Sequence, residues 1–208
     1  MSAATETRHR SRQKLLEAAL SVIRARGYAA TTVDDICAAA GVTKGSFFHH
    51  FKSKEALVLD AVDYWNDWTG GAFASAPYQK LKDPRDRILG YVDFRIAILE
   101  GEVSDFTCLL GTLVQETYAT HPAVREACDN GMSSHIATLI PDIEAAKRLY
   151  APRARWSAES VGYFIQAVLQ GSFIFAKAKQ ENEIARQSLM HLRRYLESLF
   201  SSNPRKEK

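Results

Sequence analysis

The chain has 208 residues, 46% of them hydrophobic, and a formal net charge of +3. This length can bury a sizeable core in one large domain or in two smaller ones. No run of about 18 apolar residues suits a membrane span, and the N-terminus lacks the apolar segment of a secretory signal. Three scattered cysteines, Cys37, Cys108 and Cys128, argue against a disulfide framework or a zinc site. We therefore expect a soluble, cytoplasmic protein that has neither a metal nor a cofactor.

The charge is unevenly distributed along the chain. Residues 1–54 contain nine Lys or Arg and four Asp or Glu, a net charge of +5, whereas residues 55–208 contain 18 and 20, a net charge of −2. A cationic module on a near-neutral body is typical of proteins that bind the DNA phosphate backbone. A solvated basic face is the alternative when no DNA-reading motif accompanies the charge.

The first predicted elements form a compact set of short helices. Residues 1–9 have a composition typical of disorder, and an amphipathic helix is expected at about 11–26. Thr32 is a predicted N-cap for a helix that ends at Gly41, and Thr43 is a predicted N-cap for a helix over residues 44–50. Ser53 is expected to cap a third helix. Two short helices joined by a glycine turn are the signature of a helix-turn-helix, whose second helix enters the major groove of DNA.

The stretch from about Arg10 to Leu57 resembles the DNA-binding domain of TetR-type one-component transcription regulators. The resemblance rests on Arg26-Gly27-Tyr28 after an amphipathic helix, then on TTVDDI, AGVTKGSFFHHF and KSKEAL. It implies an all-α homodimer with a three-helix DNA-binding domain and basic arm at 1–54. It also implies a larger helical domain at 55–208 for dimerisation and effector binding. The implied function is a repressor that a small molecule releases from a palindromic operator.

The resemblance also indicates which residues would contact DNA. Gly45 and Ser46 are small enough to let the helix backbone approach base edges, and His49 is expected to meet a phosphate. Phe48 departs from the family, which usually has a tyrosine there whose hydroxyl bonds to a phosphate. Phe47 and Phe51 are instead expected in the core. The full predicted DNA-binding set is Arg10, Thr32, Thr43, Lys44, Gly45, Ser46, Phe48, His49, Lys52 and Lys54.

The rest of the chain has helical patterns throughout. A connector helix is expected to end at Gly70-Gly71, Asp83-Pro84 to begin a new helix, and Pro141 to break one. Ser157 and Asn182 are predicted N-caps of the last two helices. The predicted helices span about 54–69, 85–99, 106–119, 122–140, 143–150, 157–179 and 182–200.

The last two helices indicate dimerisation. The helix over 157–179 is apolar nearly all round, and the final helix has leucines three and four residues apart. A four-helix interface between two copies would cover this surface, as it does in TetR-type regulators; the alternative is a core within one chain. The predicted interface residues are Val161, Phe164, Val168, Phe175, Leu189, Leu192 and Leu196.

Polar residues set among apolar ones on the middle helices are candidates for an effector pocket. Glu116 hints at a cationic or hydrogen-bonding ligand, unless it is exposed or paired with an arginine. Aromatic residues there could equally be plain core. The predicted ligand-binding set is Trp65, Phe94, Cys108, Thr112, Glu116, Gln166, Gln170 and Phe173.

The segment FTCLLGTLVQE raises a second hypothesis for the signal. It resembles the GCLLGxLxQE segment of a TetR subgroup that includes sensors of electrophiles or oxidants, although Thr107 replaces the glycine before Cys108. A sensing thiol needs access and a lowered pKa. The alternatives are thus a thiol-responsive repressor acting through Cys108, or a Cys108 that serves as a small buried hydrophobe.

Other classes of function fit the sequence less well. No phosphate-binding glycine loop, GxSxG elbow or HExxH motif is found, so we expect no enzyme. An architectural DNA binder without a sensor would not need such a long run of apolar helices after its helix-turn-helix.

Overall fold

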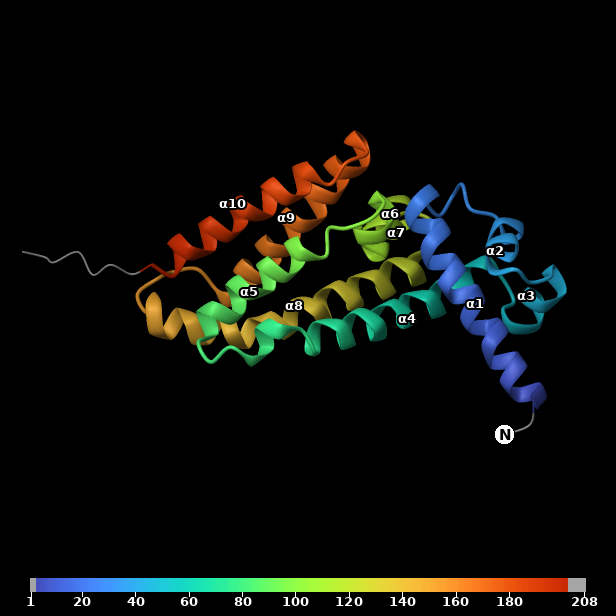
Figure 1. The fold of residues 1–208 in the computed structure, drawn as a ribbon, viewed down its shortest axis with the longest axis horizontal. Helices are drawn as coiled ribbons and strands as arrows, with labels where there is room; N and C mark the ends of the chain where they lie inside the picture. Colours follow the sequence, from blue (N-terminus) through green and yellow to red (C-terminus); the bar gives the residue numbers. More distant parts are fainter. Residues whose placement is uncertain (1–2, 202–208) are drawn as a thin grey trace, which may run out of the picture. The chain divides into compact units, whose positions relative to one another are not determined.

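The computed structural model describes residues 3–201, which form ten α-helices and one short 3-10 helix with no strand among them (Figure 1). The all-α prediction is confirmed. By packing, the described chain forms two compact units: residues 3–71 with 107–132, and residues 72–106 with 133–201. The predicted domain division after residue 54 falls inside the first unit. No helix of the described residues is long and apolar enough to cross a membrane.

The first unit is built around α1 (Ala3–Arg26), α2 (Val33–Ala40) and α3 (Lys44–His50). It also contains most of α4 (Lys54–Ala74), all of α7 (Leu109–Thr117) and the start of α8 (Pro122–Tyr150). The predicted core residues Phe47 and Phe51 are buried as expected, and Leu57 is buried with them. Helix α1 packs against both α2 and α7, so the helix-turn-helix unit shares its core with a helix from the middle of the chain.

Helix α1 begins earlier than the sequence analysis predicted. The disorder expected over residues 1–9 is wrong for residues 3–9, which are helical, while residues 1–2 lie outside the described part. Alanines at positions 3 and 4 and an acid at position 6 favour the start of a helix. Arg10 and Arg12 therefore lie in the middle of α1 rather than in its first turn.

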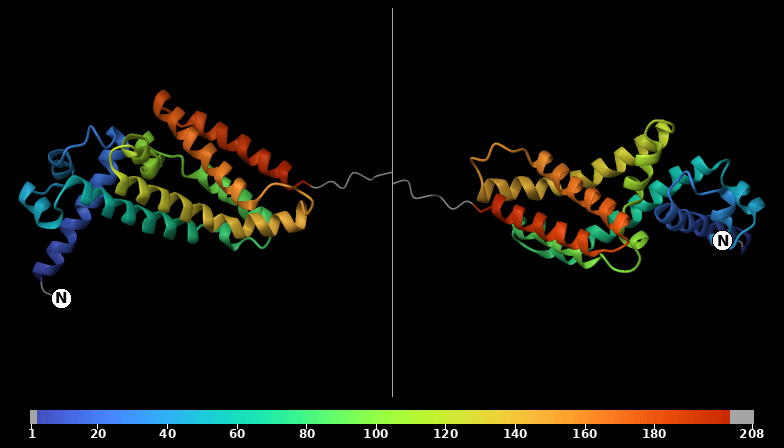
Figure 2. Two further views of the ribbon diagram at one scale, coloured as in Figure 1. Left: turned by 180° about the vertical axis from the view of Figure 1, so that it is seen from behind. Right: turned by 90° about the horizontal axis from the view of Figure 1, so that it is seen from above.

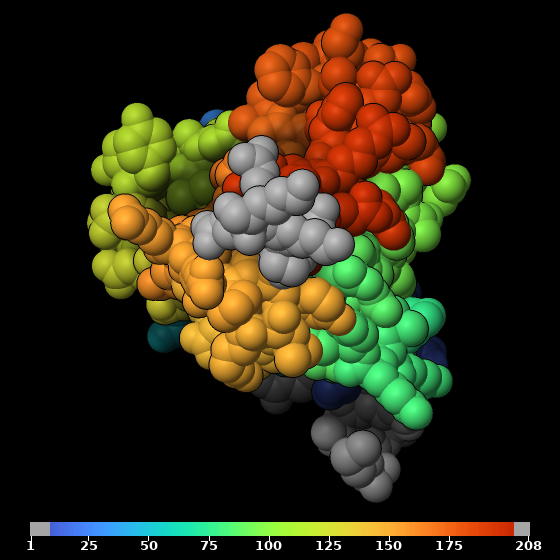
Figure 3. All heavy atoms as spheres, turned by 90° about the vertical axis from the view of Figure 1, so that its left-hand side faces the viewer, coloured from blue at the N-terminus to red at the C-terminus, as the bar shows by residue number. Residues whose placement is uncertain are grey.

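The second unit contains η1 (Pro77–Lys80), α5 (Pro84–Ala97), α6 (Val103–Phe106), the rest of α8, α9 (Ala158–Lys179) and α10 (Glu183–Leu199). Helices α9 and α10 lie side by side, and α10 also packs on α5 (Figure 2). The face seen in Figure 3 brings together η1 and α5 (green), the turn after α8 (orange) and α10 (red).

Two predicted helix ends are wrong. Helix α4 continues through Gly70 and Gly71 to Ala74, because Phe73 packs into the aromatic core of the second unit and holds the last turn. Helix α8 continues through Pro141. Proline has no amide hydrogen, so the carbonyl one turn earlier loses its helical donor; because Pro141 is exposed, water can replace that donor. The helix predicted over 106–119 is instead divided at Thr107-Cys108 into α6 and α7.

The two caps predicted for the second unit's long helices behave differently. Ser157 caps α9 through its side chain, which accepts a bond from the amide of Ser160 at 3.0 Å. Asn182 precedes α10 but does not cap it; its Nδ2 donates to the carbonyl of Leu99 at 2.8 Å. The amide thus ties the α9–α10 turn to the end of α5.

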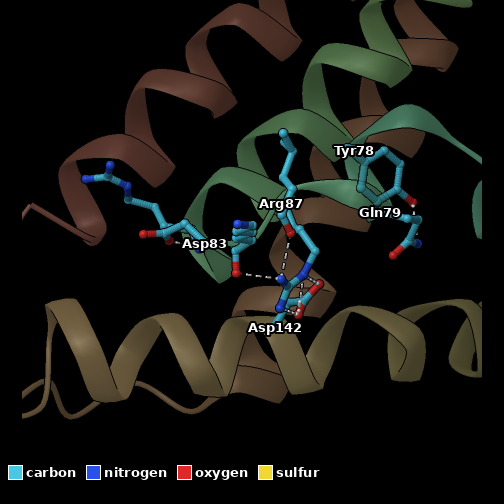
Figure 4. Close-up of polar contacts among 8 residues, drawn as sticks. Tyr78, Gln79, Asp83, Arg87 and Asp142 are labelled. Atoms are coloured by element: carbon cyan, nitrogen blue, oxygen red, sulfur yellow. Dashed lines mark hydrogen bonds and ion pairs between the residues drawn. The ribbon is translucent and has the colours of Figure 1, made fainter.

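A half-buried ion pair fixes the start of α5 against α8. Figure 4 shows the Arg87 guanidinium directed at the Asp142 carboxylate, and its Nε lies 2.9 Å from both carboxylate oxygens. Nη1 of Arg87 also donates to the carbonyls of Leu81 and Lys82 at 2.9 and 3.0 Å. Asp83 caps α5 as predicted, accepting from the amide of Arg85 at 2.8 Å and from the hydroxyl of Tyr150.

Candidate functional sites

The turn between α2 and α3 is set by two threonine caps and one glycine. Thr32 and Asp35 form a capping box, in which each side chain accepts a bond from the other residue's amide at 3.1 and 2.8 Å. Gly41 ends α2 at φ +63°, and Thr43 caps α3 by accepting from the amide of Ser46 at 3.1 Å. Each of these caps was predicted from the sequence.

Helix α3 presents a mixed polar and aromatic face to solvent. Phe48 is 52% exposed, whereas its neighbour Phe47 is fully buried; their ring centres lie 5.1 Å apart, edge to face, and only the Phe48 ring reaches the surface. The predicted DNA-binding residues that are exposed are Arg10, Thr32, Thr43, Lys44, Gly45, Phe48, His49 and Lys52, and Ser46 is half-buried. Short residues beside flexible cations suit contact with base edges and phosphates.

Lys44 and Lys54, both expected to contact DNA, have different partners. The Nζ of Lys44 lies 3.0 Å from the Asp34 carboxylate in an exposed pair. The Nζ of Lys54 donates to the carbonyls of Tyr28 and Thr31, both at 2.9 Å, and lies 4.0 Å from the centre of the Tyr28 ring. Burial lowers the pKa of Lys54, which fits an ammonium turned into the protein. Lys54 is therefore excluded from the proposed DNA-contacting set.

Glu116, a predicted ligand residue, holds the same loop from α7. Its two carboxylate oxygens accept from the amides of Tyr28 and Ala29 at 3.2 and 2.8 Å. The carboxylate also covers Gly27, where an added Cβ would lie 2.2 Å from Oε1. Glu116 is thus a backbone anchor for the α1–α2 loop, neither free for a ligand nor paired with an arginine.

The other predicted ligand residues divide between the two units. In the first, Trp65 lies under the Arg24 guanidinium at 5.0 Å, and the Thr112 hydroxyl donates to the carbonyl of Cys108 at 2.9 Å. In the second, Phe94, Gln166 and Phe173 lie among aromatic side chains, and Gln170 is half-buried. Cys108 is half-buried and precedes α7 as its N-cap residue.

A polar cluster in the second unit was only partly foreseen. The Tyr91 hydroxyl lies 2.9 Å from Nε2 of His135 and accepts a bond from Nε2 of Gln166 at 3.1 Å. Burial, with the charge of Arg95 as a smaller contribution, lowers the pKa of His135 to about 4. Of this cluster Gln166 was predicted as a ligand residue, but Arg95, which lies one helical turn after Tyr91 on the same face of α5, was not. That spacing is the signal that could have found it.

Two family models match the chain. The first, described as bacterial regulatory proteins of the tetR family, covers residues 15–61, and the second, a tetracyclin repressor-like C-terminal domain, covers residues 84–192. The second match alone covers more than half of the chain. The chain belongs to the TetR family.

Curated TetR-family relatives match mainly the N-terminal part. The repressor KstR2 of Mycolicibacterium smegmatis is 41% identical over 76 residues, which are 34% of this chain and 37% of that protein. The repressor DhaR of Mycobacterium sp. (strain GP1) is 33% identical over 114 residues, 55% of this chain and 56% of that protein. The chain thus spans between about one third and a little over half of these relatives' lengths.

Solved structures of the TetR family share the fold over most of the chain. A regulator from Chloroflexus aurantiacus gives a TM-score of 0.81 at 24% identity, covering 92% of this chain and 96% of that one. The reduced form of NemR from E. coli gives 0.73 at 24% identity, covering 88% and 95%. At these identities the similarity describes the fold alone.

The burial of residues on α9 and α10 differs from that expected for the predicted dimer interface of this TetR-family chain. Val161, Leu189, Leu192 and Leu196 are buried within the second unit, so the leucine seam of α10 packs on α9 and α5 of its own chain. These four were wrongly assigned to contact between copies. Phe164 and Phe175 are exposed and Val168 is half-buried. The exposed large apolar residues of α9 and α10 are Tyr163, Phe164, Ile174, Phe175, Met190 and Tyr195.

Proposed function

We propose that the protein is a transcriptional repressor that binds a palindromic operator as a homodimer and is released by a small-molecule effector. The observation that carries this proposal is the capped α2–turn–α3 unit, whose exposed face combines small residues with Lys44, Phe48 and His49. The relatives KstR2 and DhaR are named as repressors, which favours repression. Two such units would meet successive major grooves roughly 34–36 Å apart.

Dimerisation is supported by the exposed side of α9 and α10. The Phe164 and Tyr195 rings contact each other there at a tilt, with ring centres 5.0 Å apart, yet both remain over 40% exposed. An added Cβ at Gly171 would meet nothing within 4 Å, so this position leaves room for a second helix to approach closely. An apolar surface of this kind is typical of a protein–protein interface. We propose that it pairs with a second copy of the chain.

DNA fragments from upstream of the protein's own gene and its neighbours would test operator binding. Footprinting would locate the site, and fluorescence anisotropy would measure affinity. We expect Lys44→Ala and His49→Ala to weaken binding and to reduce the salt slope by about 1 per lost phosphate contact. Lys80→Ala, on η1, is the matched control. Unchanged affinity in both α3 variants would reject the assignment of α3 as the reading helix.

Phe48 offers a more specific test of α3. Because its ring is exposed, Phe48→Tyr adds a hydroxyl that can donate to a phosphate, and operator affinity should rise about 2- to 10-fold. The matched change Phe47→Tyr places the same hydroxyl in a fully buried position and should instead destabilise the first unit. Loss of operator affinity in Phe48→Tyr would mean that the ring packs against a base or methyl group.

A thiol signal through Cys108 is the second candidate. Its support is the half-buried position of Cys108 at the start of α7, where it packs against the core that contains Cys128. Burial, more than Cys108, raises the pKa of Cys128 to about 12, which makes Cys128 a poor nucleophile. Treatment of the operator complex with hydrogen peroxide would decide: release that persists in Cys108→Ser rejects this candidate.

A further inference from the structure

Arg95 is an internal cation surrounded by aromatic rings. It lies on α5, and its guanidinium carbon is 5.0 Å from the ring centre of Phe73, 5.9 Å from that of Tyr91 and 5.8 Å from that of Phe173. These rings come from α4, α5 and α9 and belong to one packed unit. Cation–π contacts with several rings stabilise a guanidinium in part but do not use its hydrogen-bond donors.

The donors of Arg95 contrast with those of other arginines in the same unit. Arg87 bonds to Asp142 and Arg193 to Asp93, whereas no carboxylate of the described residues lies within ion-pair distance of Arg95. The Nε of Arg95 is buried and has no hydrogen-bond partner among the described residues. A buried donor on a cation is costly to leave unbonded, so such a group is expected to serve a bound partner.

The side chains that face Arg95 carry no compensating charge. Burial keeps His135 neutral, with a pKa of about 4, and raises the pKa of Tyr78 to about 12. Asp142, which also influences Tyr78, is already bonded to Arg87. The surroundings therefore hold one positive charge, which matches a ligand with one negative charge better than a phosphate with two.

We propose that Arg95 binds the carboxylate of an amphipathic effector whose apolar or aromatic body packs against Phe73, Tyr91 and Phe173. The planar guanidinium can donate two parallel bonds to the two oxygens of a carboxylate, which distinguishes an acid from its neutral analogues. Gln166 bonds to the hydroxyl of Tyr91 and so holds that ring in place. This inference rests on the proposed function and adds the chemical class of the effector.

Calorimetric titration of the free protein, without DNA, tests the site directly. The probes are matched pairs of acid and amide: octanoate with octanamide, 3-phenylpropionate with 3-phenylpropanamide, and 1-naphthylacetate with its amide. We expect the acid of at least one pair to bind at least 10-fold more tightly than its amide. Arg95→Gln should remove that preference and leave amide binding unchanged. Arg95→Lys should keep part of it, because the charge remains but the paired donors are lost.

Arg85→Gln is the matched control: Arg85 also lies on α5 with its guanidinium over a ring, that of Tyr150, and its buried Nε has no hydrogen-bond partner among the described residues, but its Nη2 lies 3.5 Å from the Asp86 carboxylate. It should retain the full acid preference, and the melting temperature of each variant reports whether it is folded. No acid preference in any pair, or an equal preference in Arg95→Gln, overturns the proposal. If Arg95→Gln fails to fold, Arg95→Lys decides: an acid preference undiminished from that of the unsubstituted protein overturns it.

Operator release is measured separately and distinguishes this inference from the proposed function. An acid that binds through Arg95 without releasing DNA would support the carboxylate site but contradict release of the operator by an effector bound there. Release by the amides as readily as by the acids would support an effector-controlled repressor and overturn the role of Arg95.

Discussion

At the scale of single residues, two opposite charges hold the loop between α1 and α2 by its backbone. Lys54 donates to the carbonyls of Tyr28 and Thr31, and Glu116 accepts from the amides of Tyr28 and Ala29. Bonds between charged side chains and backbone groups are among the stronger hydrogen bonds in proteins. The position of the α1–α2 loop, and of the helix-turn-helix that follows it, therefore depends on α7, which supplies the Glu116 carboxylate.

Glu116→Ala tests this dependence. We expect a loss of about 1 kcal/mol in unfolding free energy, because two amides lose their acceptor and only the exposed one, that of Ala29, can readily bond to water instead. Hydrogen exchange of the amides of Tyr28 and Ala29 should accelerate in the folded state. Gln115→Ala, one position earlier on α7, is the control and should leave both amides protected. Unchanged exchange in Glu116→Ala would show that the carboxylate does not hold the loop.

His135 makes stability depend on pH. Its pKa is lowered to about 4 in the folded state, mainly by burial, and its ordinary value is 6.5. Between these values the unfolded chain binds a proton that the folded chain does not, so stability falls as the pH falls. From pH 7 to pH 5 this group should cost about 2 kcal/mol.

Chemical denaturation at both pH values checks this expectation. His135→Asn removes the titrating group, so the variant should lose about 2 kcal/mol less than the unsubstituted protein between pH 7 and pH 5. The comparison concerns the change with pH rather than absolute stability, because the other histidines are common to both proteins. Equal losses would contradict the assigned pKa.

Residues with local partners were predictable from sequence, and residues with distant partners were not. Thr32, Thr43 and Ser157 bond to amides three positions away, so their roles follow from spacing. Glu116 and Lys54 bond to groups that are more than 20 positions away, and the tertiary fold decides which groups those are. Arg95 has a local signal in its spacing from Tyr91, but the Phe73 and Phe173 rings that surround it come from other helices.

At the scale of helices, glycines in α4 and α8 should respond oppositely to the same substitution. Gly70 and Gly71 lie inside α4, and a Cβ at either would meet nothing within 4 Å. Replacing both with alanine should stabilise the protein by about 1–2 kcal/mol, because alanine favours the helix. At Gly131 in α8, an added Cβ would lie 2.7 Å from Asn66 and 2.8 Å from Leu110, so Gly131→Ala should cost about 1–3 kcal/mol.

Thermal or denaturant unfolding of the double variant in α4 and of Gly131→Ala measures both signs. A destabilised double variant in α4 would mean that the glycines are required in a conformation other than the helix. A neutral Gly131→Ala would mean that the Asn66 and Leu110 side chains move aside easily.

Helix interiors were predicted well and helix ends less well. Periodicity placed α2, α3, α5, α9 and α10 within a few residues, because each buries one face and begins at a recognisable cap position. Gly70 and Pro141 were wrongly taken as ends, since their local preferences are overridden by packing further along the same helix. Such an override depends on Phe73 and on the Arg87–Asp142 pair, neither of which a local pattern contains.

At the scale of the whole molecule, the exposed side of α9 and α10 decides the proposed assembly. These helices carry more apolar residues than one contact within the chain covers, but the spacing of those residues does not divide them between the chain's own core and a partner. Leu189 and Leu192 face inward, whereas Phe164 and Phe175 face outward. The helical period shows which apolar residues share a face of the helix, but only the packed structure shows which face is exposed.

Phe175→Glu tests that division. Phe175 is 59% exposed, so the change should leave the folded chain intact but place a charge in the proposed interface. We expect sedimentation to shift from dimer to monomer at micromolar concentration, with operator affinity falling accordingly. Leu149→Glu is the control, because Leu149 is 64% exposed on α8 and away from these helices in sequence. A Phe175→Glu variant that remains dimeric would place the interface elsewhere.

The exposed pair of Lys44 and Asp34 has a consequence for how the protein searches along DNA. The Asp34 carboxylate lies 3.0 Å from the Lys44 ammonium, so a DNA phosphate that binds Lys44 would compete with this carboxylate. DNA of random sequence can replace the Lys44–Asp34 pair only with a phosphate contact, whereas the operator also adds contacts to its bases. Asp34→Asn should therefore tighten binding to random DNA by up to about 5-fold, the limit set by an exposed ion pair, and bring it closer to operator affinity. One surface carboxylate would then shorten the time that the protein spends on the wrong sequence.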